Sequence, residues 1–194
     1  MEVIRFENSI LSSNSFLLSA PDRLDYWLVD VGDLEEILAF LPKGGVIKGV
    51  LLTHTHYDHI YGLNDLFRLF PNITVYTSVY GHKALCDYRL NFSLVNNVFF
   101  SYSGNNVVEL HEDDKLDVLD SELIVEETPG HCPSCLSYYN DSYIFTGDSY
   151  IPGVATVVKL PKSNPTEAFL SELRIKELSI NKTICPGHGP IRHV

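Results

Sequence analysis

Three histidines and one aspartate gather within six positions of this sequence, directly after a run of aliphatic residues. They are His54, His56, Asp58 and His59. Imidazole and carboxylate groups are the ligands that zinc and similar divalent cations take in proteins. The chain holds only eight histidines in 194 residues, so three of them in one short loop are hard to explain as packing. The segment therefore predicts a metal-binding loop.

Three further residues of the same chemical types follow predicted strands later in the chain. They are His131, Asp148 and His188, and a glycine precedes each of them directly. Glycine allows the backbone to turn tightly, and side chains that follow the ends of neighbouring strands share one edge of a sheet. We therefore expect these residues to return to the histidine loop, which gives seven candidate ligands in total.

The elements that must position these residues read as strands and helices in two successive groups. Strands are expected over residues 3–6, 15–19, 26–31, 46–53, 73–76, 107–110, 123–127, 138–139, 143–146 and 183–185, which are rich in β-branched and aromatic residues. Helices are expected from an Asp33 cap, over 59–70, from a Ser78 cap to about 90, and from an Asn164 cap. The apolar positions expected in the last helix are Ala168, Leu170, Leu173 and Leu178. Two strand-rich halves, each closed by helices, indicate helices outside a two-sheet sandwich.

Length and composition predict a single domain over residues 1–194. Hydrophobic residues make up 45% and charged residues 20%, as in ordinary globular proteins. The net charge of −11 disfavours nonspecific binding to nucleic acid, whose backbone is also negative. The N-terminus lacks a signal-peptide pattern and no run approaches the ~18 apolar residues of a membrane span. We therefore expect a cytoplasmic protein with reduced cysteines and no membrane association, with Cys86 and Cys185 in the core.

In their order and spacing, the seven candidate ligands resemble the metal-binding motif of the metallo-β-lactamase superfamily. The resemblance spans nearly the whole chain. It includes the Asp30-Val31-Gly32 turn and residues 87–93, which are similar to a segment of glyoxalase II-like members. It implies an α+β fold, a four-layer αββα sandwich with the metals at one edge of the sheets.

The same resemblance implies two divalent metal ions, expected to be Zn²⁺ with Fe or Mn as alternatives. The residues that match the ligands are His54, His56 and His131 for the first ion, Asp58, His59 and His188 for the second, and Asp148 as the bridge. Two such ions lower the pKa of a bridging water to about 7. The resulting hydroxide attacks an electrophilic carbon or phosphorus, and Asp58 is expected to orient it.

These implications predict a dinuclear metal-dependent hydrolase acting on a small thioester or related ester, similar to glyoxalase II. Phosphodiesterase and lactonase activity are alternatives on the same centre, because a fold does not choose a substrate. A further alternative is an oxidoreductase with one iron ion, similar to persulfide dioxygenases. The chain ends four residues after Pro190, without room for the glutathione-binding domain of glyoxalase II. We therefore expect an open site that takes another small molecule.

Four residues near these motifs are candidates for contact with the substrate, namely Lys159, Lys162, Tyr57 and Cys132. The two lysines are suited to a substrate carboxylate or phosphate, although solvent exposure is the usual state of lysine. Tyr57 is suited to an oxyanion or to packing. Cys132 and Cys135 form a Cys-x-x-Cys pair, for which small packed residues are the favoured interpretation and a redox-active or metal-binding pair is the alternative.

Overall fold

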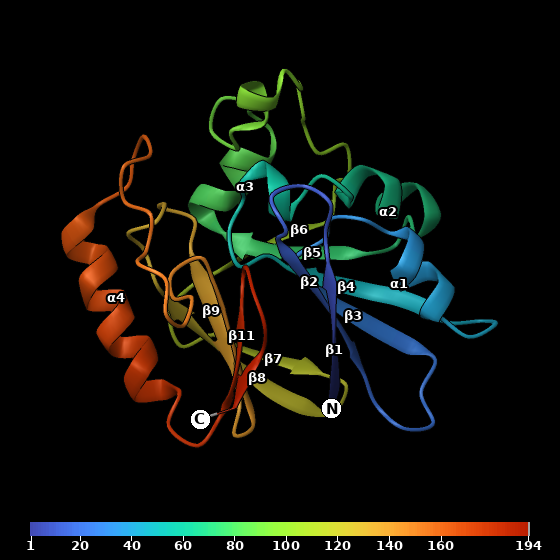
Figure 1. Ribbon diagram of the computed structural model, residues 1–194. Helices are drawn as coiled ribbons and strands as arrows, with labels where there is room; N and C mark the ends of the chain where they lie inside the picture. Colours follow the sequence, from blue (N-terminus) through green and yellow to red (C-terminus); the bar gives the residue numbers. More distant parts are fainter. Residues whose placement is uncertain (194) are drawn as a thin grey trace.

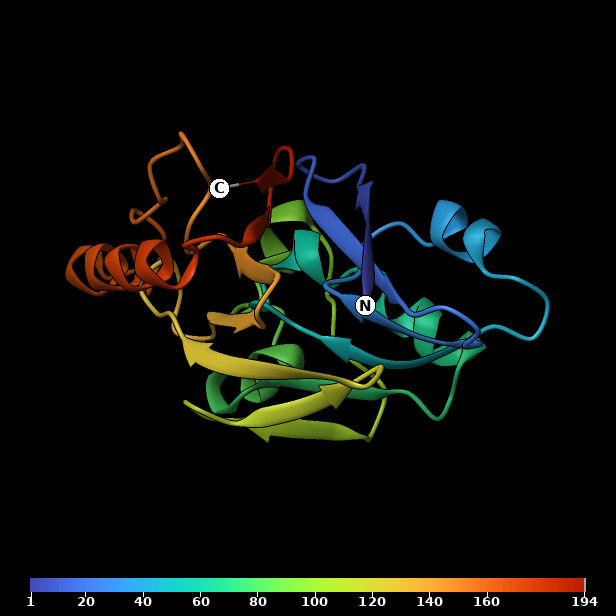
Figure 2. The same cartoon turned by 90° about the horizontal axis from the view of Figure 1, so that it is seen from below.

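The computed structural model describes residues 1–193, and its strands form two six-stranded sheets packed face to face (Figures 1 and 2). The first sheet contains, in spatial and sequence order, β1 (Glu2–Glu7), β2 (Asn14–Ser19), β3 (Asp25–Val29), β4 (Val46–Leu51), β5 (Thr74–Ser78) and β6 (Val107–Leu110). The second sheet contains, in spatial order, β12 (Arg192–His193), β11 (Thr183–Pro186), β10 (Tyr143–Gly147), β9 (Leu136–Tyr139), β8 (Ser121–Glu127) and β7 (Lys115–Val118).

Strand directions in the second sheet bring three loops to the same edge. β10 and β11 are parallel, and β8 runs in their direction because β9 is antiparallel to both β8 and β10. The residues that follow these strands include His131, Asp148 and His188. Their predicted convergence at one sheet edge therefore follows from the strand pairing.

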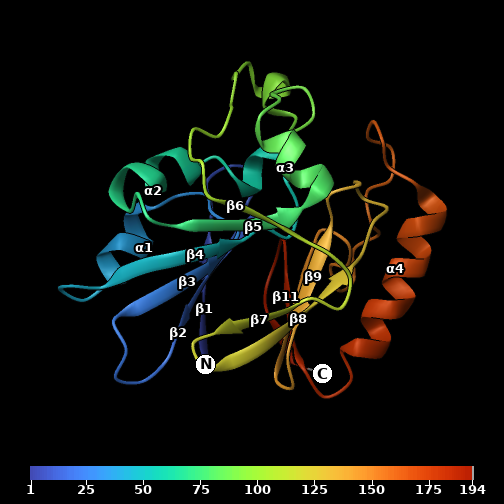
Figure 3. The same cartoon turned by 180° about the vertical axis from the view of Figure 1, so that it is seen from behind.

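Helices cover the outer face of each sheet, as the predicted αββα sandwich requires. The helices are α1 (Glu35–Phe40), α2 (Leu63–Leu69), α3 (Val79–Leu85) and α4 (Pro165–Leu178), with 3-10 turns at Tyr57–His59 and Ser93–Asn96. Figure 3 shows α1 and α2 outside the first sheet and α4 outside the second. Among the described residues, every helix is too short or too polar to serve as a membrane span. The predicted fold class is confirmed.

Three separate clusters of buried side chains hold the four layers together. Leu17 belongs to the cluster beneath α1 and α2, whereas its neighbours Phe16 and Leu18 belong to the cluster between the sheets. Alternate residues of a strand point to opposite faces, so β2 contributes to both clusters and is buried throughout. Ile175 of α4 packs in the third cluster with Ile144 of the second sheet. Each fully buried aliphatic or aromatic side chain contributes about 1.5–3 kcal/mol.

The predicted Asp33 cap of α1 is wrong. Leu34 occupies the cap position without a side-chain hydrogen bond. The Asp33 carboxylate instead accepts hydrogen bonds from the backbone N and the Oγ of Ser9, at 2.6 and 3.0 Å. Asp33 therefore ties the β1–β2 connection to the turn before α1, a long-range contact that local sequence pattern does not encode.

Two other helices are shorter than predicted. α2 begins at Leu63, because residues 57–59 form a separate 3-10 turn. α3 starts at its predicted cap, where Ser78 Oγ accepts a hydrogen bond from the backbone N of Gly81 at 3.1 Å. It ends before residue 86 rather than near 90, and Cys86 is exposed rather than in the core.

Candidate metal centre

The histidine loop, residues 54–59, is anchored where β4 ends. The carboxylate of Asp30 accepts hydrogen bonds from the backbone N and the Oγ1 of Thr53, at 2.7 and 2.6 Å. From the second sheet, the hydroxyl of Tyr138 donates to the carbonyl of Leu52 at 2.7 Å. Both contacts are buried. They fix the backbone immediately before the loop and tie it to both sheets.

A first group of ligand-type side chains contains His54, His56 and His131, whose ring nitrogens lie within 4.8 Å of one another. All three side chains are buried. His56 Nδ1 and His131 Nε2 are 3.0 Å apart. His131 Nδ1 lies 2.9 Å from the carbonyl of Val157, and His54 Nδ1 lies 3.2 Å from Thr53 Oγ1. These contacts engage Nδ1 of His54 and His131, leaving Nε2 of both rings for the group.

A second group contains Asp58, His59 and His188, again with ligand atoms within 4.8 Å of one another. Oδ2 of Asp58 lies 3.3 Å from His59 Nε2 and 3.4 Å from His188 Nε2. The opposite ring nitrogens are held from behind. His59 Nδ1 lies 2.9 Å from Asp30 Oδ2, and His188 Nδ1 lies 3.1 Å from the carbonyl of Leu11. Such contacts to the far nitrogen orient a metal-binding histidine.

Asp148 lies between the two groups and contacts both. Its Oδ1 is 3.5 Å from His59 Nε2, and its Oδ2 is 3.4 Å from His188 Nε2 and 3.6 Å from His131 Nε2. A Cβ at Gly187 would lie only 2.1 Å from Asp148 Oδ1. Glycine at this position is therefore what allows the β11 turn to close against the carboxylate.

Several buried polar atoms at this place have no hydrogen-bond partner. Among the described residues they include His54 Nε2, His56 Nε2 and Asp148 Oδ1. An unsatisfied buried polar group costs about 1–3 kcal/mol, so a cluster of them indicates an ion or ligand that they bind. Imidazole nitrogens and carboxylate oxygens are a donor set suited to zinc and iron. The residues present therefore fit a divalent metal centre.

Electrostatics at the site also favour cation binding. Burial and neighbouring imidazoles hold the pKa of His54 well below its usual value, so its ring is neutral. Burial acts to raise the pKa of Asp148, but the hydrogen bond with His188 and the charge of His59 outweigh it and lower that pKa. Burial acts to lower the pKa of His188, but Asp148 and Asp58 outweigh it and raise that pKa to about 10. In the metal-free protein His188 therefore carries a proton, and this positive charge takes the place of a metal ion beside Asp148 and Asp58.

Asp30 is a site residue whose role the sequence did not reveal. It forms a third close group with His54 and His59. Both of its oxygens already accept hydrogen bonds, from Thr53 and His59, so it serves to position His59. Its backbone φ is 54°, in the left-handed region. In the sequence, Asp30 is marked only by the Asp30-Val31-Gly32 turn, and that motif does not indicate that the carboxylate orients a histidine.

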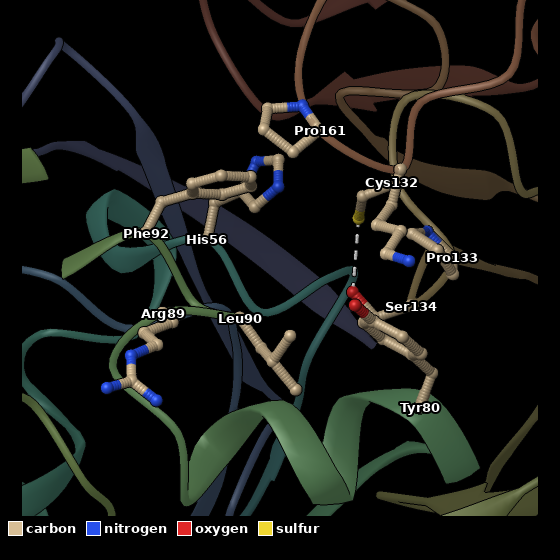
Figure 4. Close-up of a pocket in the computed structure, with 10 residues that line it drawn as sticks. His56, Tyr80, Arg89, Leu90, Phe92, Cys132, Pro133, Ser134 and Pro161 are labelled. Carbon is tan, nitrogen blue, oxygen red and sulfur yellow. Dashed lines mark hydrogen bonds between the residues drawn. The ribbon is translucent and has the colours of Figure 1, made fainter. Parts of the chain in front are cut away.

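A cavity of about 140 Å³ opens beside His56 (Figure 4). Its lining residues include Arg89, Leu90, Phe92, Cys132, Pro161 and Lys162. They come from the α3–β6 connection, the loop after β8, and the β10–α4 connection. Phe92 has a left-handed φ of 60°, and its ring meets that of His56 edge-on at 4.8 Å between centroids.

The four predicted substrate contacts fall in different places. Lys162 and Cys132 line the cavity, whereas Lys159 is exposed and does not. Tyr57 is partly buried and packs against the rings of Tyr61 and Phe100, at 5.8 and 5.9 Å between centroids. The structure thus brings two of the four to the cavity and places the other two outside its lining.

Comparison with known proteins identifies the family to which this chain belongs. Residues 11–188 match the sequence model of a family described as the metallo-beta-lactamase superfamily. The chain belongs to the metallo-β-lactamase superfamily. The match covers most of the chain and contains both groups of ligand-type side chains and Asp148.

Superfamily members with known names include hydroxyacylglutathione hydrolases. That of Buchnera aphidicola is 29% identical over 181 residues, which are 93% of this chain and 64% of the relative. That of Pectobacterium atrosepticum is 26% identical over 162 residues, 83% of this chain and 56% of the relative. The chain therefore spans about three-fifths of the length of these relatives.

Solved structures of the superfamily share the fold at low sequence identity. The BLEG-1 B3 metallo-β-lactamase is 24% identical with a TM-score of 0.88, over 99% of this chain and 94% of that chain. TTHA1623, solved in a di-iron-bound form, is 23% identical with a TM-score of 0.83, over 98% of this chain and 94% of that chain. These likenesses concern the fold.

Proposed function

We propose that this chain is a hydrolase that uses two divalent metal ions to cleave a small thioester or related ester. The observation that carries the proposal is Asp148, whose carboxylate contacts members of both ligand-type groups. The proposed ligands are His54, His56 and His131 for one ion, Asp58, His59 and His188 for the other, and Asp148 for both. Zinc is the proposed ion, and iron is the alternative because TTHA1623 holds two irons.

The chain's own residues supply orientation of the attacking group. When bound, the ions supply Lewis acidity and a water of lowered pKa. Asp58 meets His59 and His188 through Oδ2, which leaves Oδ1 to accept a hydrogen bond from the attacking water. Asp58 is 8% exposed, so it lies where the buried cluster meets solvent. In the proposed mechanism Asp58 therefore orients the attacking water or hydroxide.

The cavity beside His56 supports a substrate with an apolar body and a negatively charged end. Leu90, Phe92 and Pro161 offer hydrocarbon surface, and Lys162 offers positive charge, whereas the guanidinium of Arg89 lies over the ring of Tyr88, which is outside the lining. None of the described lining residues is acidic, although the chain as a whole carries a net charge of −11. We therefore propose that an anionic acyl or thiol portion of the substrate lies beside the ammonium group of Lys162.

The names of the relatives support thioester chemistry. A hydroxyacylglutathione carries its acyl group on sulfur, and the Buchnera and Pectobacterium relatives are named as hydrolases of it. Because this chain spans only part of their length, its own thioester must be found by experiment.

Metal analysis followed by a substrate panel tests the proposal. Protein purified without added metal is assayed for zinc, iron and manganese, and then for hydrolysis of thioesters, lactones and phosphodiesters. We expect two ions per chain and thioester hydrolysis. One iron per chain with oxygen consumption would identify the oxidoreductase alternative instead. If only lactones or phosphodiesters are hydrolysed, the proposed metal centre stands and the proposed thioester substrate is wrong.

Variants at the centre connect the activity to these residues. Asp58→Ala and His131→Ala are each expected to abolish hydrolysis. His82→Ala is the matched control, because His82 pairs with Glu109 on the surface. Wild-type turnover by either centre variant would rule out the mechanism.

A further inference from the structure

The Cys132–Cys135 pair has no task in the proposed hydrolysis, yet its two thiols are in contact. Their Sγ atoms are 3.2 Å apart, and the side chains are 4% and 3% exposed. The turn that joins them is closed by the backbone N of Cys135, which donates to the carbonyl of Cys132 at 3.4 Å. Cys132 Sγ also lies 3.1 Å from Ser134 Oγ.

The two thiols occupy different positions relative to the cavity. Cys132 lines it together with His56, whereas Cys135 does not. Figure 4 shows the Cys132 side chain directed among the other lining residues, with its sulfur facing Ser134. The pair therefore has one thiol that a small molecule in this cavity reaches, Cys132, and a second, Cys135, that lies outside it and lines a separate hollow with Pro129 and Pro133.

We propose that Cys132 and Cys135 form a thiol–disulfide exchange site for a small organic disulfide that enters this cavity. The Cys132 thiolate attacks one sulfur of the small disulfide, whose S–S bond breaks and releases one thiolate. That thiolate takes up the proton that Cys132 lost. Cys135, after losing its own proton, then attacks Cys132 Sγ and releases the second small thiol. Two protein thiols are oxidised, and one small disulfide is reduced to two thiols.

The geometry permits the second step with little movement. A disulfide bond is about 2.05 Å long, so the two sulfurs, now 3.2 Å apart, must approach by about 1.1 Å. The first step favours a small partner over a protein one, because only 4% of Cys132 is exposed. Leu90 and Phe92 give the cavity an apolar wall suited to the organic groups of such a disulfide.

The exchange site has a consequence for the neighbouring metal centre. A mixed disulfide on Cys132 occupies the cavity beside His56, where the proposed substrate lies. Because Cys135 displaces this adduct in the intact pair, we expect hydrolysis to fall in a Cys135→Ser variant treated with the disulfide and to return when a reductant removes the adduct. The chemistry of the thiols itself does not depend on hydrolysis, so it is measured separately.

Mass spectrometry of the folded, metal-loaded protein tests the proposal. Cys86 is exposed and would react by itself, so a Cys86→Ser parent is used. After treatment with hydroxyethyl disulfide, the parent is expected to lose two of its three remaining thiols without retaining an adduct. Peptide mapping of the parent should locate the new bond between Cys132 and Cys135.

Two variants of that parent separate the steps. Cys135→Ser should retain one adduct per chain, because nothing displaces it. Cys132→Ser should neither gain an adduct nor lose thiols. A folded parent that keeps all its thiols overturns the proposal, and so does a disulfide mapped elsewhere. An adduct on Cys135 in the Cys132→Ser variant also overturns it. Thiol counting requires no hydrolysis, so failure here is distinct from failure of the proposed activity.

Discussion

Oδ2 of Asp30 lies 2.9 Å from Nδ1 of His59, and the two side chains are 1% and 0% exposed. This contact turns the opposite nitrogen of His59 toward Asp58 and Asp148. Asp30 follows β3, whereas His59 belongs to the loop after β4. The orientation of the His59 ring, a candidate metal ligand, is therefore set by a residue that follows the neighbouring strand β3.

Replacing Asp30 with asparagine should weaken metal binding. The amide has one acceptor oxygen, so it cannot serve Thr53 and His59 as both carboxylate oxygens now do. Loss of such a supporting contact typically costs 10–100-fold in metal affinity, and we expect about that loss for Asp30→Asn. Competition with a chelator measures it. Asp33→Asn serves as control, and an unchanged affinity in Asp30→Asn would contradict the assigned role.

The metal-free protein should lose stability as the pH rises through the alkaline range. The pKa of His188 is raised from 6.5 to about 10 by Asp148 and Asp58. A raised pKa stabilises the fold fully below the unfolded value and loses this effect as pH rises through the folded value. Melting temperatures of chelator-treated protein from pH 6 to about 10 should therefore decline. His188→Gln should flatten the decline, and identical curves for the two proteins would refute this account.

Removing the positive charge of Lys162 should weaken binding of anionic substrates. Lys162→Ala is expected to raise KM for thioesters with a carboxylate several-fold and to leave kcat nearly unchanged, because Lys162 lines the cavity but belongs to neither group of ligand-type side chains. Lys159→Ala is a matched control, since Lys159 is exposed and outside the lining. Steady-state kinetics with charged and neutral thioesters compare the two. Equal effects of both variants would remove Lys162 from the site.

The start of α4 offers a prediction on stability. Asn164 Oδ1 accepts hydrogen bonds from the backbone N of Thr166 and Glu167, at 3.0 and 3.3 Å. Loss of such a cap costs about 0.5–2 kcal/mol, so Asn164→Ala should lower the free energy of unfolding by about 1 kcal/mol. Asn164→Asp keeps an acceptor and should restore most of it. Urea denaturation measures all three proteins, and a fully stable alanine variant would show that the cap contributes nothing.

The convergence of the ligand-type residues could be predicted because it depends on strand ends. His131, Asp148 and His188 each follow a strand of the second sheet, and strands that run in one direction end at one edge. Ligand chemistry and glycine turns mark these places in the sequence. The cavity could not be predicted in this way, because Phe92 and Lys162 meet there from separate long connections.

The inward face of α4 shows why packing partners limit such predictions. Of the expected apolar positions, Ala168 faces inward together with Ser171, but Leu170 and Leu173 are 58% and 50% exposed. A Cβ on Gly130 would lie 2.1 Å from the backbone N of Ala168. The helix approaches the loop before His131 so closely that only small residues fit, which its own periodicity does not reveal.

Both ligand-type groups draw side chains from both sheets. His54 and His56 follow a strand of the first sheet and His131 one of the second, while His59 and His188 divide in the same way. An ion held by either group therefore acts as a cross-link between the two halves of the chain. Its binding energy would resist separation of the sheets as well as serve chemistry. Removal of the ion by a chelator should therefore speed amide hydrogen exchange in the strands of both sheets that lead to these ligands, away from the substrate cavity.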